Sequence, residues 1–287
     1  MKNNDKFIII GGDSRQLYMA DYLEKKGNTV YIYGLPEKSR ICSPDLSAVI
    51  KTVKNVILPL PISKDGKYLF GIVPMKETVD DIVSMISSDH IVFAGMVSRP
   101  MEAKLKKNGS RVFDYFKREE VTVMNAVPTV QGILKAMIDN IEYTINSSRI
   151  AVFGYGRIAS VTADVLSSIG ADVTVCARKY SDLAKAKTKG YNSCLISDFS
   201  KTANEYDMII NTVPSVVINR NILENLRTDC LIIDVASSPY GTDFAVASEL
   251  GLNAVLCSSL PGKVAPKTAG EIIADGVLNI LREEFHE

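Results

Sequence analysis

The sequence of 287 residues has few side chains of the kind that most often act as general bases near neutral pH. It contains only two histidines, His90 and His286. His286 is one residue from the end of the sequence, and His90 directly precedes a predicted strand. A 2-hydroxy acid dehydrogenase normally uses histidine to accept the hydroxyl proton, because the histidine pKa lies near neutrality. If the protein oxidises its substrate, the shortage of histidine therefore favours a substrate that loses its proton more easily than an alcohol does.

The cysteines show no pattern of disulfide or metal binding. Five cysteines, an odd number, are scattered without C-x-x-C spacing, at Cys42, Cys176, Cys194, Cys230 and Cys257. We expect them to be reduced thiols of an intracellular protein. The cysteines, histidines and carboxylates also show no metal-ligand spacing, so we predict no metal site.

Charge and hydrophobicity exclude further classes of protein. The sequence has 33 basic and 33 acidic residues, and this balance gives no long-range attraction to nucleic acid or to an anionic membrane. No run of eighteen apolar residues occurs, and the apolar segment 7–10 is followed at once by glycines rather than by a signal-peptide pattern. We expect a cytoplasmic protein. The P-loop motif and the G-x-S-x-G elbow are both missing, which sets aside kinases and hydrolases.

Predicted strands and helices alternate along the whole sequence. In the first half, strands are predicted at 7–10, 29–33, 56–59 and 91–94, with helices at 14–26 and 76–87. In the second half, strands are predicted at 150–153, 172–177, 193–196, 208–212, 230–235 and 254–256. This alternation predicts an α/β protein with two doubly wound parallel sheets, the first flavodoxin-like and the second a Rossmann-type dinucleotide-binding domain.

The order of these elements also predicts the domain boundaries. The first domain is expected to comprise residues 1–124 and 266–287, and the second residues 125–265. A helix over 126–143, with Pro128 near its start, is expected to link them. The last helix is predicted to return and pack on the first domain.

The segment 150–159 is the most informative part of the sequence, because a buried strand runs into a glycine turn that opens a helix. In its G-x-G-x-x-A pattern, Gly154 permits a tight turn and Gly156 leaves room for a pyrophosphate. Ala159 allows the helix and strand to pack closely. The anion would bind at the helix N-terminus, so we predict that Arg157 and Ile158 also contact the cofactor.

The end of the next strand indicates which dinucleotide binds. An NAD site usually has an acidic residue there for the ribose 2′-hydroxyl, but this strand ends in Arg178 and Lys179, and no carboxylate follows until Asp182. Two cations suit a 2′-phosphate. We therefore predict that NADP(H) is preferred and that NAD(H) is possible. A solvated basic turn is the alternative interpretation.

Two other strand ends hold small or polar residues where ligands bind in open parallel sheets. Thr212 and Pro214 follow the fourth strand of the second half, and Ala236 and Ser237 follow the fifth. We predict that these four residues contact the cofactor. They could equally be ordinary turn residues.

Two helix starts are candidates for binding an anionic substrate. The first follows Gly11-Gly12 and includes Asp13, Ser14 and Arg15, of which Arg15 could bind a carboxylate beside the free N–H groups. The same residues could be simple N-cap chemistry, and their spacing is not that of a dinucleotide site. The second candidate is the first turn of the last helix, with Lys267 and Thr268. An exposed lysine with no ligand is the alternative there.

Five motifs together resemble the family of the A-type subunit of dipicolinate synthase, and the resemblance spans nearly the whole sequence. The motifs are G-G-D-x-R-Q at 11–16, P-T-V-x-G at 128–132, N-T-x-P-S at 211–215, G-T-D-F at 241–244, and L-P-G-x-V-A-P-K-T-A-G at 260–270. The resemblance implies an NADP-dependent oxidoreductase that converts dihydrodipicolinate to dipicolinate in the mother cell of a sporulating bacterium. It also implies a partner, the flavoprotein-like B-type subunit of dipicolinate synthase, and we expect a homo-oligomer.

The resemblance further implies a substrate with two carboxylates, which needs two anion-binding stations. We predict that Asp13, Ser14 and Arg15 form one station, and that Lys267 and Thr268 form the other. Thr129, from the second motif, is expected to contact the substrate as well. The catalytic group is not identified, and Arg15 and Lys267 are the candidates. Two other functions stay open, namely a D-2-hydroxy acid or alanine dehydrogenase relative and a non-catalytic regulatory protein that binds NADP.

Overall fold

The structure is a computed structural model, and it describes residues 4–36 and 45–285. Cys42 and His286 lie outside these residues. The chain divides into two compact units, the first made of residues 1–125 and 265–287 and the second of residues 126–264. Each unit contains one parallel sheet.

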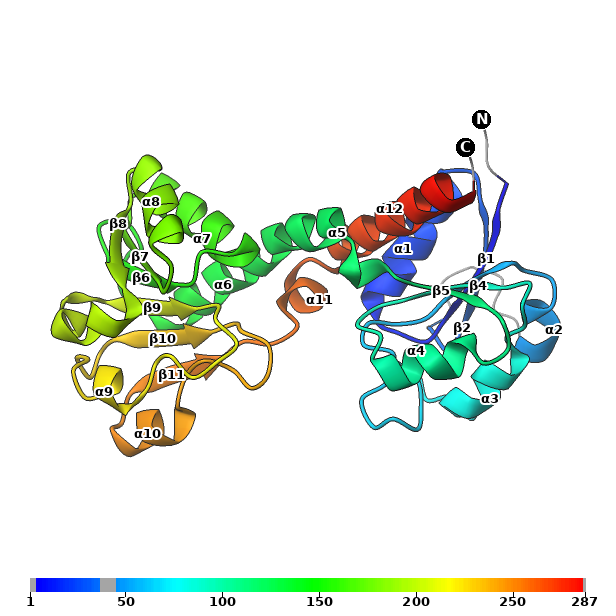
Figure 1. The fold of residues 1–287 in the computed structure, drawn as a ribbon, viewed down its shortest axis with the longest axis horizontal. Coiled ribbons are helices and arrows are strands. Elements are labelled where there is room, and N and C mark those ends of the chain that lie inside the picture. Colours follow the sequence, from blue (N-terminus) through cyan, green and yellow to red (C-terminus); the bar gives the residue numbers. More distant parts are fainter. Residues whose placement is uncertain (1–3, 37–44, 286–287) are drawn as a thin grey trace. The chain divides into compact units, whose positions relative to one another are not determined.

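The sheet of the first unit has five parallel strands in the order β2-β1-β3-β4-β5, which is the flavodoxin-like order (Figure 1). Its strands are β1 (Lys6–Ile10), β2 (Thr29–Tyr33), β3 (Asn55–Ile57), β4 (Ile91–Ala94) and β5 (Arg111–Asp114). The helices are α1 (Ser14–Lys25), α2 (Leu46–Ile50), α3 (Val79–Met85), α4 (Arg99–Lys106), α5 (Glu119–Met124) and α12 (Pro266–Phe285). The order confirms the predicted fold of this half.

Both faces of the first sheet are buried, which explains its nearly continuous apolar strands. Phe7 and Ile9 of β1 belong to a core shared with α1 and α12. Ile8 and Ile10 point to the opposite face and belong to a core shared with α2, α3 and α4. The alternating side chains of one strand therefore anchor two separate helix layers.

Helix α12 returns to the first unit, as predicted, and packs beside α1 and α5 (Figure 1). The crossing with α1 is close because Gly270 has no side chain, and a Cβ there would collide with the backbone carbonyl of Arg15. A second glycine, Gly276, faces Val121 of α5 in the same way. Gly270 therefore fixes α12 against the start of α1, and Gly276 fixes it against α5.

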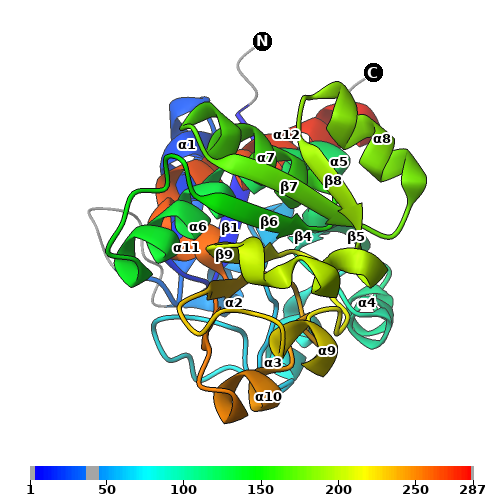
Figure 2. The ribbon, with the colours of Figure 1, turned by 90° about the vertical axis from the view of Figure 1, so that its left-hand side faces the viewer.

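The sheet of the second unit has six parallel strands in the order β11-β10-β9-β6-β7-β8, with β6 beside β9 (Figure 2). Counted within the unit, this is the 3-2-1-4-5-6 order of a Rossmann fold. The strands are β6 (Arg149–Phe153), β7 (Asp172–Ala177), β8 (Asn192–Leu195), β9 (Met208–Asn211), β10 (Leu231–Asp234) and β11 (Asn253–Leu256). The α-helices are α6 (Ala126–Asn140), α7 (Arg157–Ser168), α8 (Tyr180–Thr188), α9 (Arg220–Leu223), α10 (Phe244–Glu249) and α11 (Leu260–Val264).

Several predicted boundaries differ from the structure. The helix predicted at 76–87 begins only at Val79, because Thr78 caps it and accepts a hydrogen bond from the Asp81 N–H. The linking helix ends at Asn140 instead of residue 143. The strand β5 and the helices α2 and α4 were not predicted.

The segment Glu119–Asn140 is long and apolar enough to cross a membrane by length and composition alone, and 44% of its most apolar window is buried in the structure. Val130, Ile133 and Met137 of this segment are fully or almost fully buried in the core of the second unit. Gly132 faces Leu260 of α11, where a Cβ would lie 2.7 Å from the Leu260 Cβ. These contacts are those of a core helix.

Candidate functional site

The glycine turn after β6 adopts the conformation that its sequence predicts. Gly154 has φ +97°, a region that side chains disfavour, and its N–H donates to the carbonyl oxygen of Cys176 (2.8 Å). A Cβ on Gly154 would lie 2.6 Å from Thr212 Oγ1. Glycine is therefore required here by both the backbone and the neighbouring strand.

Gly156 has a different role from Gly154. It is the N-cap of α7 with an ordinary φ of −85°, it is exposed, and a Cβ there would meet no atom within 4 Å. No side chain caps the first turn of α7. The helix therefore presents its N-terminal backbone to open space, and the cradle fits a phosphate group that approaches the chain closely.

The turn lies at the point where the strand order of the second sheet reverses, between β6 and β9. Thr212 follows β9, and its Oγ1 donates to the carbonyl oxygen of Phe153 at the end of β6 (2.8 Å). This bond joins the two strand ends directly beneath the turn. A reversal of strand order is where doubly wound sheets bind nucleotides.

A pocket of about 360 Å³ opens beside the same edge of the sheet, and Arg178 lines it. The other lining residues come from the end of β8 and the segment that follows it, from the loop after β9 and from α9, and they are Leu195, Ile196, Ser197, Val216, Val217, Asn219, Asn221 and Ile222. The pocket is therefore built from the strand ends where the adenosine part of a dinucleotide binds in this fold. The arginine is on the surface, with its charge at the wall of the pocket.

The structure does not group all of the predicted cofactor residues around this pocket. Lys179 is the exposed N-cap residue of α8 and does not line the pocket, and neither does the exposed Pro214. The buried Ala236 and the exposed Ser237 lie in the loop after β10. Their contact with a cofactor therefore stays a prediction.

Asp234, at the end of β10, is not among the residues selected from the sequence. It is fully buried, and its carboxylate accepts hydrogen bonds from the N–H groups of Ala236 and Gly241, both 2.9 Å. It therefore holds the Ala236–Gly241 loop in place. The signal in the sequence is a carboxylate directly after an apolar strand, since a carboxylate at that place needs hydrogen-bond donors.

In the first unit, the start of α1 is closed by its own side chains. Asp13 is the N-cap residue, and its Oδ1 accepts from the N–H of Arg15 (2.9 Å). In return, Gln16 Oε1 accepts from the N–H of Asp13 (2.8 Å), which completes a capping box. The simple interpretation of Asp13 as an N-cap residue is therefore correct for this element.

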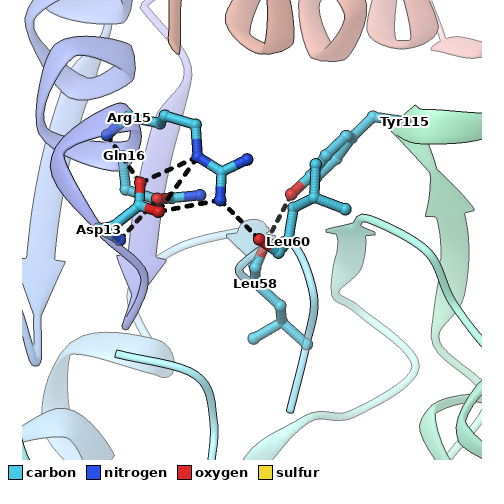
Figure 3. Close-up of polar contacts among 6 residues, drawn as sticks. All are labelled: Asp13, Arg15, Gln16, Leu58, Leu60 and Tyr115. Atoms are coloured by element: carbon cyan, nitrogen blue, oxygen red, sulfur yellow. Dashed lines mark hydrogen bonds and ion pairs between the residues drawn. The ribbon is translucent and has the colours of Figure 1, made fainter. Parts of the chain in front are cut away.

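Arg15 is almost buried and is held by two oxygen groups (Figure 3). Its Nε and Nη2 bond the Asp13 carboxylate at 2.9 Å, and Nη2 also donates to the carbonyl oxygen of Leu60 (2.7 Å). The third nitrogen, Nη1, has no hydrogen bond within the described part of the chain. Asp13 therefore orients the guanidinium and leaves one edge for another acceptor.

Gln16 is a second donor beside Arg15 that sequence reasoning did not select. It is 0% exposed, and its Nε2 has no hydrogen-bond partner within the described residues. The amide orientation is fixed because its oxygen must face the Asp13 N–H. Figure 3 shows the Nε2 end lying beside the Arg15 guanidinium. The Asp13-x-x-Gln16 spacing predicts the capping box, but only the fold reveals the unused donor.

Tyr115 lies on the far side of Arg15 and is fully buried (Figure 3). Its hydroxyl donates to the carbonyl oxygen of Leu58 (3.1 Å), and burial raises the pKa of its phenol. Tyr33, at the end of β2, donates to Glu77 (2.7 Å), and its burial together with this carboxylate raises the pKa of Tyr33 to about 12. Both tyrosines are therefore neutral near pH 7.

The remaining predicted substrate residues lie in three helices, α12, α1 and α6. Lys267 and Thr268 are exposed in the first turn of α12, one turn before Gly270. Since Gly270 contacts the backbone of Arg15, the first unit brings the two predicted anion stations to neighbouring helix starts. Ser14 is half-buried at the start of α1. Thr129 belongs to the second unit, where it is buried in α6.

His90, the one histidine among the described residues, serves a structural role. It is 6% exposed, its Nδ1 accepts from the N–H of Ser87 (2.9 Å), and its Nε2 lies 2.9 Å from the carbonyl oxygen of Ile50. Both ring nitrogens are therefore used within the fold. Within residues 4–36 and 45–285, no group of three or more histidine, cysteine or acidic residues could hold a metal ion.

Comparisons with known proteins agree with this geometry. Residues 6–116 match the family described as the N-terminal domain of the A-type subunit of dipicolinate synthase. Residues 142–248 match the family described as "Putative NAD(P)-binding", which agrees with the Rossmann topology of the second unit. The chain is similar over 97% of its length to the transhydrogenase structure from Sinorhizobium meliloti, covering 94% of that chain with a TM-score of 0.69. Their sequences are only 14% identical, so this similarity shows the fold alone.

Two relatives match far more specifically. The crystal structure of the A-type subunit of dipicolinate synthase from Bacillus halodurans has a TM-score of 0.86 and 29% identity, with coverage of 98% of this chain and 99% of that chain. The curated A-type subunit of dipicolinate synthase from Bacillus subtilis (strain 168) is 30% identical over 286 residues, which cover 97% of this chain and 96% of the relative. With this match over nearly both full lengths, and with the Rossmann turn and the motifs of both units in place, the chain belongs to the family of dipicolinate synthase A-type subunits.

Proposed function

We propose that this protein oxidises dihydrodipicolinate to dipicolinate with NADP⁺ as the coenzyme. Membership of the family supports the substrate, and the uncapped helix start at Gly156 supports a dinucleotide. The observation that supports NADP over NAD is Arg178 at the wall of the pocket, with no carboxylate between it and Asp182. NADP⁺ would supply the hydride acceptor for the oxidation.

The second unit would hold the coenzyme through backbone and cationic groups. The turn at Gly154 and Gly156, with the N-terminal residues Arg157 and Ile158 of α7, would bind the pyrophosphate. Arg178 and Lys179 would bind the 2′-phosphate, because a forked cation matches a phosphate and carries a permanent charge. Thr212, Pro214, Ala236 and Ser237 are proposed to line the remaining path of the coenzyme.

The first unit would hold the two carboxylates of the substrate. Arg15 Nη1 and Gln16 Nε2 are donors of the same helix turn without acceptors in the described chain, and each would bind an oxygen of a substrate carboxylate. Lys267 and Thr268 would bind the other carboxylate at the start of α12. Asp13 would act through Arg15 by fixing the plane of its guanidinium.

The chemistry needs only a weak proton acceptor. Loss of a hydride and a proton from a dihydropyridine ring creates an aromatic ring, so deprotonation is far easier than from an alcohol. A 2-hydroxy acid dehydrogenase would instead need a free histidine base, and His90 is committed to Ser87 and Ile50. This observation favours the aromatising reaction over the alcohol dehydrogenase alternative.

The coenzyme assignment is tested by Arg178→Ala, measured by calorimetry with NADP⁺ and NAD⁺. We expect NADP⁺ binding to weaken by about 1.5–3 kcal/mol, the contribution of a hydrogen bond to a charged group, with little change for NAD⁺. Lys187→Ala, a cation on the neighbouring helix α8, is the control and should leave both affinities unchanged. Equal losses for the two coenzymes with Arg178→Ala would refute the 2′-phosphate assignment.

The substrate assignment is tested by the steady-state kinetics of Lys267→Ala and Arg15→Lys. The second variant keeps the charge but removes the guanidinium fork. We expect a higher KM or a lower kcat for dihydrodipicolinate in both, with the Kd for NADP⁺ unchanged. If neither variant alters the kinetics, the two anion stations are wrong. Coenzyme binding without any turnover, even with all partner proteins present, would instead indicate a regulatory role.

The family also suggests the setting in which the protein acts. We propose that it works with the B-type subunit of dipicolinate synthase and forms a homo-oligomer in the cytoplasm of a sporulating cell. Size-exclusion chromatography with light scattering, with and without that partner, measures both associations. A monomer that elutes unchanged in the presence of the partner would contradict the assignment.

A further inference from the structure

Two cysteines face each other directly on neighbouring strands of the second sheet. Cys176 of β7 and Cys194 of β8 are paired residues in the parallel register, and their Sγ atoms are 3.4 Å apart. Cys176 is fully buried, whereas Cys194 is partly exposed. The proposed catalytic and binding groups include neither thiol.

The two thiols differ in reactivity because of their surroundings. Burial raises the pKa of Cys176 well above its ordinary value. The hydrogen bond from the Cys176 S–H lowers the pKa of Cys194, although partial burial and the Asp198 charge oppose this effect. Since the thiolate is the nucleophile, Cys194 is the thiol that reacts first, and it is also the one that solvent reaches.

The pair lies within two residues of side chains that line the proposed coenzyme pocket. Cys176 is two residues before Arg178, and Cys194 directly precedes Leu195 and Ile196, and all three of these neighbours line the pocket. A change in the spacing of the two thiols is therefore transmitted along two short backbone segments to the pocket wall.

We propose that Cys176 and Cys194 form a peroxide-sensitive dithiol site whose closure to a disulfide weakens coenzyme binding at Arg178. The Cys194 thiolate attacks one oxygen of hydrogen peroxide, the O–O bond breaks, and a sulfenic acid and water are formed after proton uptake. The Cys176 sulfur then attacks the sulfenic sulfur, and its proton leaves with the hydroxyl group as a second water. Two thiols are oxidised, and one peroxide is reduced to two waters.

The strand geometry permits this bond. Neighbouring strands lie about 4.8 Å apart, within the range of roughly 4.4–6.8 Å that disulfides span between Cα atoms. The bond requires the sulfurs to approach from 3.4 Å to about 2.05 Å. This approach draws the ends of β7 and β8 together, so Arg178 and Leu195 shift relative to each other across the pocket.

The first experiment looks for the bond itself in the full-length protein. The reduced protein is treated with hydrogen peroxide, free thiols are alkylated, and tryptic peptides are mapped by mass spectrometry without reduction. We expect peptides 158–178 and 190–201 to be joined, and dithiothreitol to separate them.

Cys194→Ser should abolish the joined pair, while the control Cys257→Ser, which removes a partly buried thiol elsewhere in the unit, should preserve it. Absence of the joined peptides, or faster oxidation of Cys257, would overturn the site.

The second experiment rests on the proposed function and measures the Kd for NADP⁺ in the reduced, oxidised and re-reduced protein. We expect oxidation to weaken binding about tenfold, the effect of one lost bond to a charged group, and dithiothreitol to restore it. Cys194→Ser should bind NADP⁺ as the reduced protein does and be insensitive to peroxide. A joined peptide pair with unchanged affinity would overturn the link to the pocket. If the reduced protein binds no coenzyme, the proposed function fails, and the peptide map still decides the dithiol site.

Discussion

The two units begin with the same strand, glycine turn and helix, but the N-termini of the two helices are capped differently. In each, a buried strand at the reversal of strand order runs into a glycine turn and then a helix, β1 into α1 and β6 into α7. At α1, the Asp13 carboxylate accepts from the first-turn backbone and pairs with Arg15. At α7, the N-cap is Gly156 and no side chain caps the helix.

This difference shows how one local topology serves two purposes. A helix N-terminus favours a negative charge, and α1 obtains this charge from its own sequence. The same position at α7 has neither a charge nor a side chain, which leaves room for the anion proposed above. One residue, Asp13 or Gly156, therefore decides whether the helix start is closed by its own carboxylate or is open to solvent.

Asp13→Ala should have the largest effect on stability, because it removes the carboxylate that caps α1 and pairs with Arg15. We expect the free energy of unfolding to fall by about 3 kcal/mol, since the change removes a cap and leaves the nearly buried Arg15 charge unpaired. Urea denaturation measures the loss. Asp243→Ala, which removes only the cap of α10, is the matched control and should cost about 1 kcal/mol. Equal losses would mean that the pairing with Arg15 contributes nothing.

Gly156→Asp should give α7 the side-chain N-cap that it lacks and that α1 has in Asp13. A carboxylate at the N-cap should stabilise the protein by a few tenths of a kcal/mol and weaken NADP⁺ binding about 100-fold, or roughly 2.8 kcal/mol. Thermal unfolding and calorimetry measure the two effects, which have opposite signs. Gly156→Ala is the intermediate control, with a loss of roughly 0.5 kcal/mol in stability, because alanine is a poorer N-cap than glycine, and a smaller loss of affinity. Undiminished NADP⁺ binding in Gly156→Asp would refute the comparison.

Gly154→Ala tests whether this glycine is required for the stability of the turn, in contrast to Gly156, which is proposed to leave room for the coenzyme. Because φ is +97° and a Cβ would lie 2.6 Å from Thr212 Oγ1, we expect a loss of about 2 kcal/mol in stability. Gly156→Ala should lose only roughly 0.5 kcal/mol, the difference between glycine and alanine at an N-cap. Denaturation curves for the two variants decide the matter, and similar stabilities would show that the glycines have the same role.

Gln16→Met should have the smallest effect on stability. It removes the acceptor for the Asp13 N–H but also removes the unpartnered, buried Nε2, so the net change should be below about 1 kcal/mol. The KM for dihydrodipicolinate should nevertheless rise. A large loss of stability with normal kinetics would identify Gln16 as purely structural.

Strong apolar periodicity made most of the fold predictable. The strands 29–33, 91–94 and 172–177 have the predicted bounds, because β-branched and aromatic residues fill them and glycine or polar residues end them. Strand β5 escaped prediction because its sequence, Arg-Val-Phe-Asp, has only two apolar residues and pairs with one neighbour. Such a strand exists because β4 provides its hydrogen-bonding partner, which no local pattern reveals.

The candidate site was less predictable than the fold. The turn at Gly154 and Gly156 and the position of Arg178 followed from motif spacing, since strand ends of a parallel sheet meet at one edge. The contact between Gly270 and Arg15 could not be predicted, because it joins residues more than 250 positions apart in the sequence. The unused donor of Gln16 and the paired sulfurs of Cys176 and Cys194 likewise depend on tertiary packing and strand register.

The return of α12 has a consequence for synthesis on the ribosome. Ile273, Val277 and Leu281 complete the hydrophobic core around β1 and α1, so the amino-terminal half emerges without the last part of its own interior. The unit over residues 126–264 contains its whole sheet and can condense earlier. The amino-terminal segment is thus synthesised first but completes its folding last. Loss of the final twenty residues should leave the amino-terminal unit unfolded, while the Rossmann unit stays folded.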